Sequence, residues 1–148
     1  MPGPNVIAFT LLLLATVALA GWRGGQPEKI VAGMFVLAYV ATMAGYSGMP
    51  ARFARIEPYV AAIDIAVLAG VTVVLLRADR FWPIAAFAAQ GVAVLTHLIK
   101  LIDPGIVRQA YAIALAAPGW LAVLILLAGV VRHARRAAIF GRQRDWSW

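Results

Sequence analysis

The sequence contains no cysteine and few charged residues. Only 13% of its 148 residues are charged, whereas a soluble domain carries roughly 25%. Without a thiol, the chain can form no disulfide, no thiolate metal site and no cysteine-ligated iron–sulfur cluster. Acidic residues are especially scarce, with six against thirteen basic residues.

Catalytic motifs are absent as well. The sequence has no Gly-x-Ser-x-Gly elbow, no phosphate-binding loop and no His-Glu-x-x-His motif. No group of His, Asp and Glu residues has the spacing of metal ligands on a helix. The sequence therefore indicates a non-enzymatic protein, and we expect neither a cofactor nor a metal ion.

What the sequence has in excess is apolar surface, since 64% of its residues are hydrophobic. A soluble protein of this length would leave large apolar patches facing water. Five apolar runs are long enough to cross about 30 Å of hydrocarbon. They cover residues 5–22, 30–49, 58–76, 81–102 and 106–131. The runs lack strand-like alternation, and lipid requires each segment to satisfy its own backbone hydrogen bonds, so we predict helices.

The predicted fold is therefore an all-α integral membrane protein, a compact bundle of about five transmembrane helices. Residues 1–131 form this single domain, and residues 132–148 form a basic tail that contains tryptophan. Pro58 and Pro83 fall in first helical turns, where a missing N–H is tolerated. Pro104-Gly105 predicts a tight hairpin between the last two helices, and Pro118 predicts a kink or a strong tilt in the fifth.

Charge predicts the orientation. No Lys or Arg precedes the first run, which argues against a cleaved signal peptide. With five spans, one face collects four basic residues and the other collects nine. The positive-inside rule then places the N-terminus outside and the C-terminus in the cytoplasm. Eleven of the thirteen basic residues are Arg and Ala is abundant, a bias that favours a bacterial cytoplasmic (inner) membrane.

The basic tail is expected to meet lipid rather than nucleic acid. Anionic headgroups of the inner leaflet would attract its arginines, and tryptophans favour the interface. The predicted anchor consists of Arg132, Arg135, Arg136, Arg142, Arg144, Trp146 and Trp148. The alternative is a disordered tail that serves only as a topology signal. Trp22 and Trp82, at span ends on the same face, are interpreted as interfacial residues.

One polar cluster is predicted within the membrane. Asp64 lies about 9 Å inside the third span, and His97 lies at about the same depth in the fourth. Gln90 and Lys100 share the helical face of His97. His133 falls on the opposite side of the membrane, so the two histidines do not suit a bis-histidine haem.

This cluster has two interpretations. It could be a proton or ion relay, or a polar contact that holds two helices together. The second interpretation favours an accessory, assembly or scaffold component of the membrane, which is our leading expectation. The alternative is a small transporter or channel with a relay at Asp64, His97 and Lys100. Rows of small residues, including Ala62 and Ala66 in the third span and Ala89 and Ala93 in the fourth, suit close helix packing, a homo-oligomer or a larger membrane complex.

Overall fold

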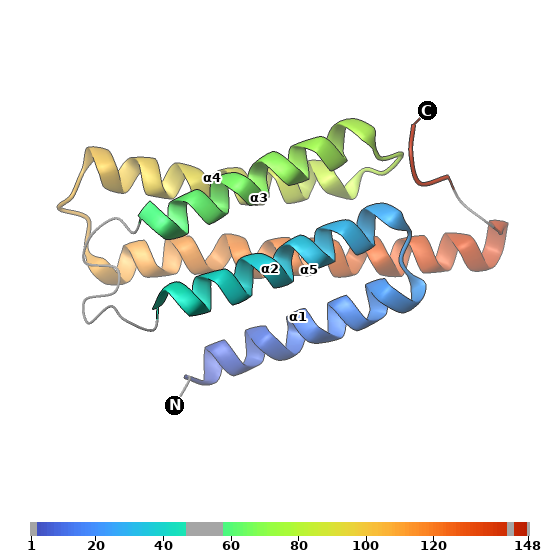
Figure 1. The fold of residues 1–148 in the computed structure, drawn as a ribbon, viewed down its shortest axis with the longest axis horizontal. Coiled ribbons are helices and arrows are strands. Elements are labelled where there is room, and N and C mark those ends of the chain that lie inside the picture. The colour runs from blue at the N-terminus through green and yellow to red at the C-terminus, as the bar shows by residue number, and fades with distance from the viewer. Residues whose placement is uncertain (1–2, 47–57, 142–143, 148) are drawn as a thin grey trace.

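The computed structural model describes residues 3–46, 58–141 and 144–147. These residues form five helices, and each of the five is long and apolar enough to cross a membrane. The helices are α1 (Pro4–Arg23), α2 (Gln26–Tyr46), α3 (Pro58–Arg77), α4 (Trp82–Ile102) and α5 (Arg108–Phe140). Figure 1 shows them as one elongated bundle. The protein is thus all-helical apart from its connections in the part of the chain that the structure describes.

Proline marks the start of four helices. Pro4 and Pro58 are the first residues of α1 and α3, while Pro27 and Pro83 are the second residues of α2 and α4. A first-turn proline costs no intrahelical hydrogen bond. Because Pro27 is tolerated in the first turn, helix α2 can begin at Gln26, four residues before the apolar run that predicted it. Its predicted end, residues 47–49, lies outside the described residues.

Helix α5 is the longest element, with 33 residues. At 1.5 Å per residue it spans about 50 Å, well beyond the roughly 30 Å of a hydrocarbon core. It continues nine residues past the predicted end of the fifth span, from residue 131 to Phe140. Residues 132–140 therefore extend this helix, whereas the sequence had placed them in the tail. Pro118 lies inside the helix.

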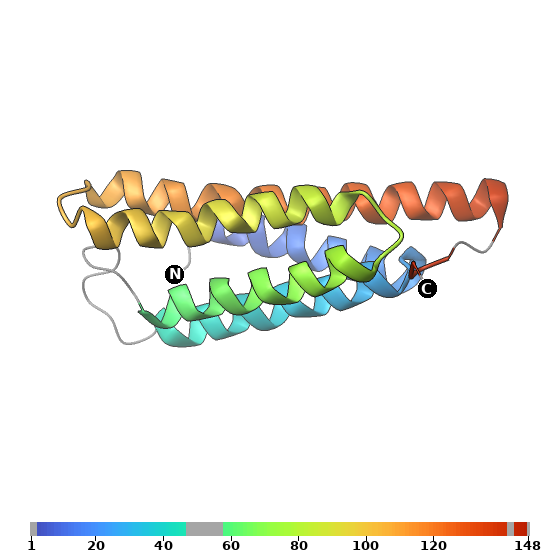
Figure 2. The ribbon, with the colours of Figure 1, turned by 90° about the horizontal axis from the view of Figure 1, so that it is seen from above.

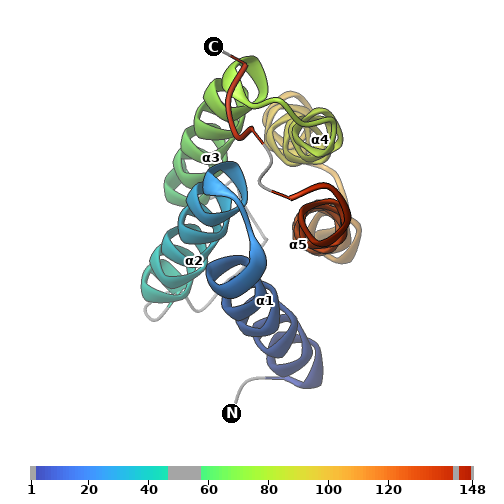
Figure 3. The same ribbon diagram turned by 90° about the vertical axis from the view of Figure 1, so that its right-hand side faces the viewer.

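Successive helices pack as antiparallel neighbours. Helix α1 contacts α2 and α5, α2 contacts α3 and α5, and α4 lies between α3 and α5. Figure 3 shows this arrangement along the bundle axis. The core is built mainly from small and branched side chains, including Val71, Ala86, Leu126 and Val130. Large apolar side chains such as Leu37 and Leu76 point outward, 71% and 75% exposed, as a lipid environment favours.

The rows of small residues differ in where they face. Ala89 and Ala93 of α4 are buried, which lets neighbouring helices approach closely. Ala62 and Ala66 of α3 are exposed. These two alanines therefore contribute to the outer surface of the bundle, whereas Gly70, the next residue of the α3 row, lies against Met34 of α2.

The two ends of the bundle differ in character. The N-terminal end holds the first turns of α1 and α3 and the α4–α5 connection. The tail end holds the α1–α2 and α3–α4 connections and residues 144–147. Seen from above, the α2–α3 pair and the α4–α5 pair converge at the tail end and diverge towards the N-terminal end (Figure 2).

The last described residues fold back onto the bundle. Trp146 forms an isolated antiparallel bridge with Ala78. The Asp79 amide donates to the Asp145 carbonyl at 3.2 Å, and the Ser147 amide donates to the Arg77 carbonyl at 2.9 Å. Residues 144–147 are therefore held against the α3–α4 connection.

Candidate functional site

Asp64 faces the interior of the bundle from the second turn of α3. The buried side chains of this helix are Val60, Val67, Val71 and Val74. Asp64 lies four residues after Val60 and three before Val67, so helical periodicity places it on the same face. Its side chain is 23% exposed. A carboxylate at this position needs polar partners, because it cannot rely on water.

Gln90 and His97 of α4 supply those partners. The Gln90 Nε2 amide donates to Asp64 Oδ1 at 3.1 Å and, at 3.3 Å, to the Asp64 carbonyl. The His97 Nε2 atom lies 2.9 Å from Asp64 Oδ2. Both α4 side chains are buried, and their spacing of seven residues puts them on one face.

Tyr111 completes the network from the first turn of α5. Its hydroxyl lies 2.8 Å from His97 Nδ1, and its ring is 1% exposed. If the hydroxyl donates to Nδ1, then Nε2 carries the ring proton and donates to Asp64. That assignment makes His97 neutral and leaves a single negative charge on Asp64. A hydrogen-bonded chain then links Asp64 to α5 through His97.

Lys100 is buried nearby but has other partners. Its Nζ donates to the carbonyls of Pro104 and Ile106, at 2.9 Å and 2.7 Å. It also lies 5.6 Å from the centre of the Tyr111 ring. The structure therefore brings Asp64, Gln90 and His97 into contact, whereas Lys100 fastens the α4–α5 connection.

Asp64 and Gln90 also line a cavity of about 610 Å³ in the N-terminal half of the bundle. All five helices contribute to its wall, which is mostly apolar. Four aromatic side chains line it: Phe9, Phe35, Tyr39 and Trp120. The Phe9 ring lies 5.7 Å from that of Tyr39 and 5.3 Å from that of Trp120, measured between ring centres. The Tyr39 hydroxyl is hydrogen bonded to Thr10.

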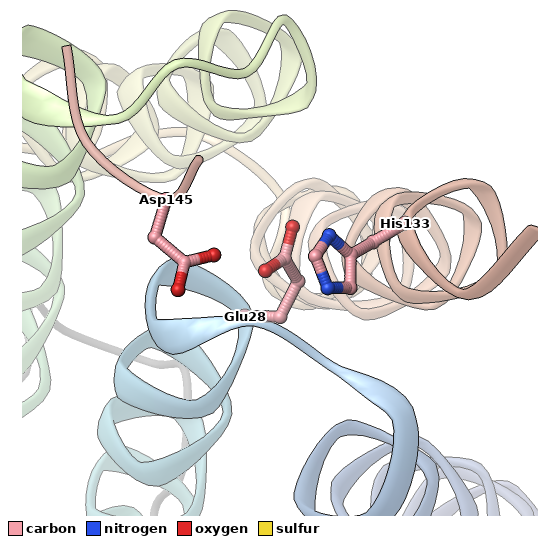
Figure 4. A group of neighbouring side chains, drawn as sticks. All are labelled: Glu28, His133 and Asp145. Atoms are coloured by element: carbon pink, nitrogen blue, oxygen red, sulfur yellow. The ribbon is translucent and has the colours of Figure 1, made fainter. Parts of the chain in front are cut away.

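A second polar cluster lies at the tail end. Glu28, in the first turn of α2, is fully buried, and its Oε1 accepts a hydrogen bond from Trp82 Nε1 at 2.9 Å. Arg80 Nε lies 3.5 Å from the same oxygen. Arg80 Nη2 lies 2.9 Å from His133 Nδ1 and 3.1 Å from Asp145 Oδ1. Figure 4 shows Glu28, His133 and Asp145 directed towards one another from α2, α5 and the tail.

The predicted lipid anchor is divided between two elements. Arg132, Arg135 and Arg136 lie exposed on the extension of α5. Arg144 is exposed and Trp146 is half-buried in the residues that pair with the α3–α4 connection. Arg142 and Trp148 lie outside the described residues.

Sequence reasoning missed three features of these sites. Glu28 carried a usable signal, because a Pro-Glu pair at the start of an apolar run is typical of a first helical turn. Asp145 carried none, since only the folded tail brings it to the bundle. The aromatic lining of the cavity comes from three helices, and its convergence depends on how those helices pack.

Comparison of the chain with protein families, with curated proteins and with solved structures finds no match.

Proposed function

We propose that the protein binds a small organic cation with an apolar body inside the membrane. The observation that carries this proposal is that the Asp64 carboxylate lines a largely apolar cavity of about 610 Å³. Ligand sites commonly have volumes of about 300–1,000 Å³, with few polar groups that orient the ligand.

The charge of the cavity favours a cation over a neutral ligand. Within the described residues, no Lys or Arg forms an ion pair with Asp64; its neighbour His97 carries no charge when the Tyr111 hydroxyl donates to Nδ1. A carboxylate in a largely apolar cavity wall attracts a positive charge, because the local dielectric is low. A bound cation would supply the compensating charge.

The aromatic side chains support the same ligand class. Cations bind over the faces of Trp, Tyr and Phe rings, and quaternary ammonium groups are recognised by cages of such rings. Phe9, Tyr39 and Trp120 form a contiguous aromatic cluster in the cavity wall. The apolar remainder of the wall would contact the body of the ligand.

Orientation and location complete the proposal. Arg23, Lys29, Arg77, Arg80 and the α5 extension place more basic charge at the tail end than at the N-terminal end. The positive-inside rule then favours a cytoplasmic tail end and a cavity in the outer half of a bacterial inner membrane. The ligand would enter from outside or from the outer leaflet. The accessory or scaffold role expected from sequence stays a prediction.

A second candidate function is a proton-coupled carrier. The chain of hydrogen bonds from Asp64 through His97 to Tyr111 favours it, since an imidazole that bridges a carboxylate and a hydroxyl can relay a proton between them when its two nitrogens exchange roles. In proteoliposomes with an imposed pH gradient, a carrier would take up the cation in exchange for protons. His97→Ala would abolish this uptake. A simple binding protein would show binding without uptake.

Binding can be measured by titrating the detergent-purified protein with tetraphenylphosphonium in a neutral maltoside. We expect saturable binding to the wild type. For Asp64→Asn the Kd should rise at least about tenfold, which corresponds to about 1.4 kcal/mol of lost binding free energy. Tetraphenylborate has the same shape and the opposite charge, so it should bind much more weakly.

Asp103→Asn is the matched control, because Asp103 is an exposed carboxylate at the same end of the bundle. It should leave the affinity for tetraphenylphosphonium unchanged. Equal affinity for the two ions, or an affinity that Asp64→Asn does not alter, would contradict the proposal.

A further inference from the structure

The tail-end cluster contains a buried oxygen that is not satisfied. Glu28 Oε2 has no hydrogen-bond partner within the described residues, although the side chain is fully buried. A buried carboxylate oxygen without a partner is costly, and native structures rarely tolerate one. A bound hydrogen-bond donor or cation would satisfy this oxygen.

His133 and Asp145 face the same space. A methyl group placed on Gly25 would lie 2.3 Å from Asp145 Oδ1, 3.0 Å from Glu28 Oε2 and 3.1 Å from His133 Cε1. The three side chains therefore converge over this glycine, which leaves room for them. One ligand atom from each of Glu28, His133 and Asp145 can be chosen so that all three lie within 4.8 Å of one another.

From this arrangement we propose that Glu28, His133 and Asp145 form a binding site for a divalent transition metal ion. One imidazole and two carboxylates suit Zn²⁺ and similar ions, whereas Mg²⁺ and Ca²⁺ prefer oxygen ligands alone. Ligands of a tetrahedral zinc lie about 3.3 Å apart, as bond lengths of about 2.0 Å require. Binding therefore draws the three side chains together by rotamer changes of about an ångström.

Arg80 is the cation that such an ion would replace. One guanidinium nitrogen, Nη2, contacts both His133 Nδ1 and Asp145 Oδ1. The lone pairs of two proposed ligands thus already converge on a single positively charged group. The Arg80 Nε atom is itself buried without a hydrogen-bond partner in the described part of the chain, so the cluster does not satisfy the guanidinium fully, although Nη1 donates to the carbonyls of Asp79 and Arg144. Released from it, the long side chain can extend towards lipid headgroups.

Metal binding would join three parts of the chain. Glu28 comes from α2, His133 from the extension of α5, and Asp145 from the segment paired with the α3–α4 connection. The ion would therefore fasten the tail to the bundle. The site lies at the end opposite the proposed cation cavity, so the two proposals can fail independently.

The test is a calorimetric titration with Zn²⁺. Tag-free protein in detergent is first treated with a chelator to remove bound metal and is then titrated. We expect one Zn²⁺ per chain, with affinity reduced at least about tenfold in Glu28→Gln, His133→Ala and Asp145→Asn. Arg80→Gln should bind Zn²⁺ more tightly than the wild type, because it removes the competing cation. A purely structural ion-pair cluster would not give this increase.

Two variants keep the test decisive. Asp145 lies beyond the last helix, so Asp145→Asn should still fold even if the buried Glu28 variant does not. Asp79→Asn removes an exposed carboxylate at the same end and should bind Zn²⁺ like the wild type. The proposal is overturned if the wild type shows no saturable binding, if Asp145→Asn binds as tightly as the wild type, or if Arg80→Gln weakens binding.

Discussion

Trp82 illustrates how a single side chain connects the packing of the bundle to its buried charge. Its indole N–H donates to Glu28, and its ring lies against the backbone of Gly129 in α5. A methyl group on Gly129 would approach the ring to 2.7 Å from Cγ and 2.8 Å from Cδ1. The ring cannot retreat freely, since that would break its hydrogen bond to a buried carboxylate. Glycine is therefore required here for close approach rather than for its backbone freedom.

Gly129→Ala should therefore destabilise the bundle. Overpacking of this kind costs about 1–3 kcal/mol, which outweighs the gain of roughly 0.5–1 kcal/mol that alanine brings to a helix interior. Thermal unfolding in detergent would measure the difference.

Gly91→Ala in α4 is the matched control, because a methyl group there meets no atom within 4 Å. It should be neutral or stabilising. A Gly129→Ala protein as stable as this control would show that α5 and Trp82 separate at little cost.

At the residue scale, the sequence allowed the depth of a residue along its helix to be predicted. The rise per residue placed Asp64 and His97 at one level, and the structure places their side chains 2.9 Å apart. The sequence was not informative about side-chain direction. Trp82 was interpreted as an interfacial residue, but its indole donates into the bundle, and Lys100 reaches backbone carbonyls rather than Asp64.

At the scale of elements, the short tail segment is the least expected feature. Residues 144–147 add a strand-like pair to a bundle that is otherwise helical in its described residues. Their backbone satisfies the Asp79 amide and the Arg77 carbonyl, which would otherwise need water or lipid headgroups.

Truncation after Gly141 should therefore expose the α3–α4 connection. We expect hydrogen exchange of the Asp79 amide to become at least about tenfold faster, because it loses its hydrogen bond to Asp145. Mass spectrometry of deuterated protein in detergent would measure the rate. Ser147→Ala keeps the backbone pairing, so its Asp79 amide should exchange like that of the wild type; unchanged exchange in the truncated protein would contradict the pairing.

The helices themselves could be predicted because lipid restricts the choice of backbone structure. Their ends were less predictable, since apolar runs stop where the hydrocarbon core stops, whereas helices continue until the backbone finds another partner. Helix α2 therefore starts at Gln26 and α5 continues to Phe140, and these two polar extensions carry Glu28 and His133. The tail pairing depends on contacts between distant segments, which no local pattern shows.

At the scale of the whole molecule, the asymmetry of charge is the feature with the clearest consequence. We expect the N-terminus outside and the C-terminus in the cytoplasm. In a bacterial host, green fluorescent protein fused to the C-terminus should fluoresce, and alkaline phosphatase fused there should be inactive. Alkaline phosphatase fused after Gly105, in the α4–α5 connection, should be active.

A fusion after Asp79 serves as the internal control, because the α3–α4 connection lies at the same end of the bundle as the tail. It should behave like the C-terminal fusion. Active phosphatase at the C-terminus would invert the bundle and place the proposed cation cavity in the inner half of the membrane.

The folding back of the tail also bears on the order in which the protein assembles during synthesis. Glu28 emerges from the ribosome early, with the second helix, and Arg80 follows only after the third. His133 and Asp145 come last, so the cluster that joins them to Glu28 cannot close until translation has passed all five helices. Until then Glu28 can contact Trp82 and Arg80 but lacks His133 and Asp145. Closure of the tail end is therefore a late step of assembly, since the cluster is incomplete until Asp145 has been made.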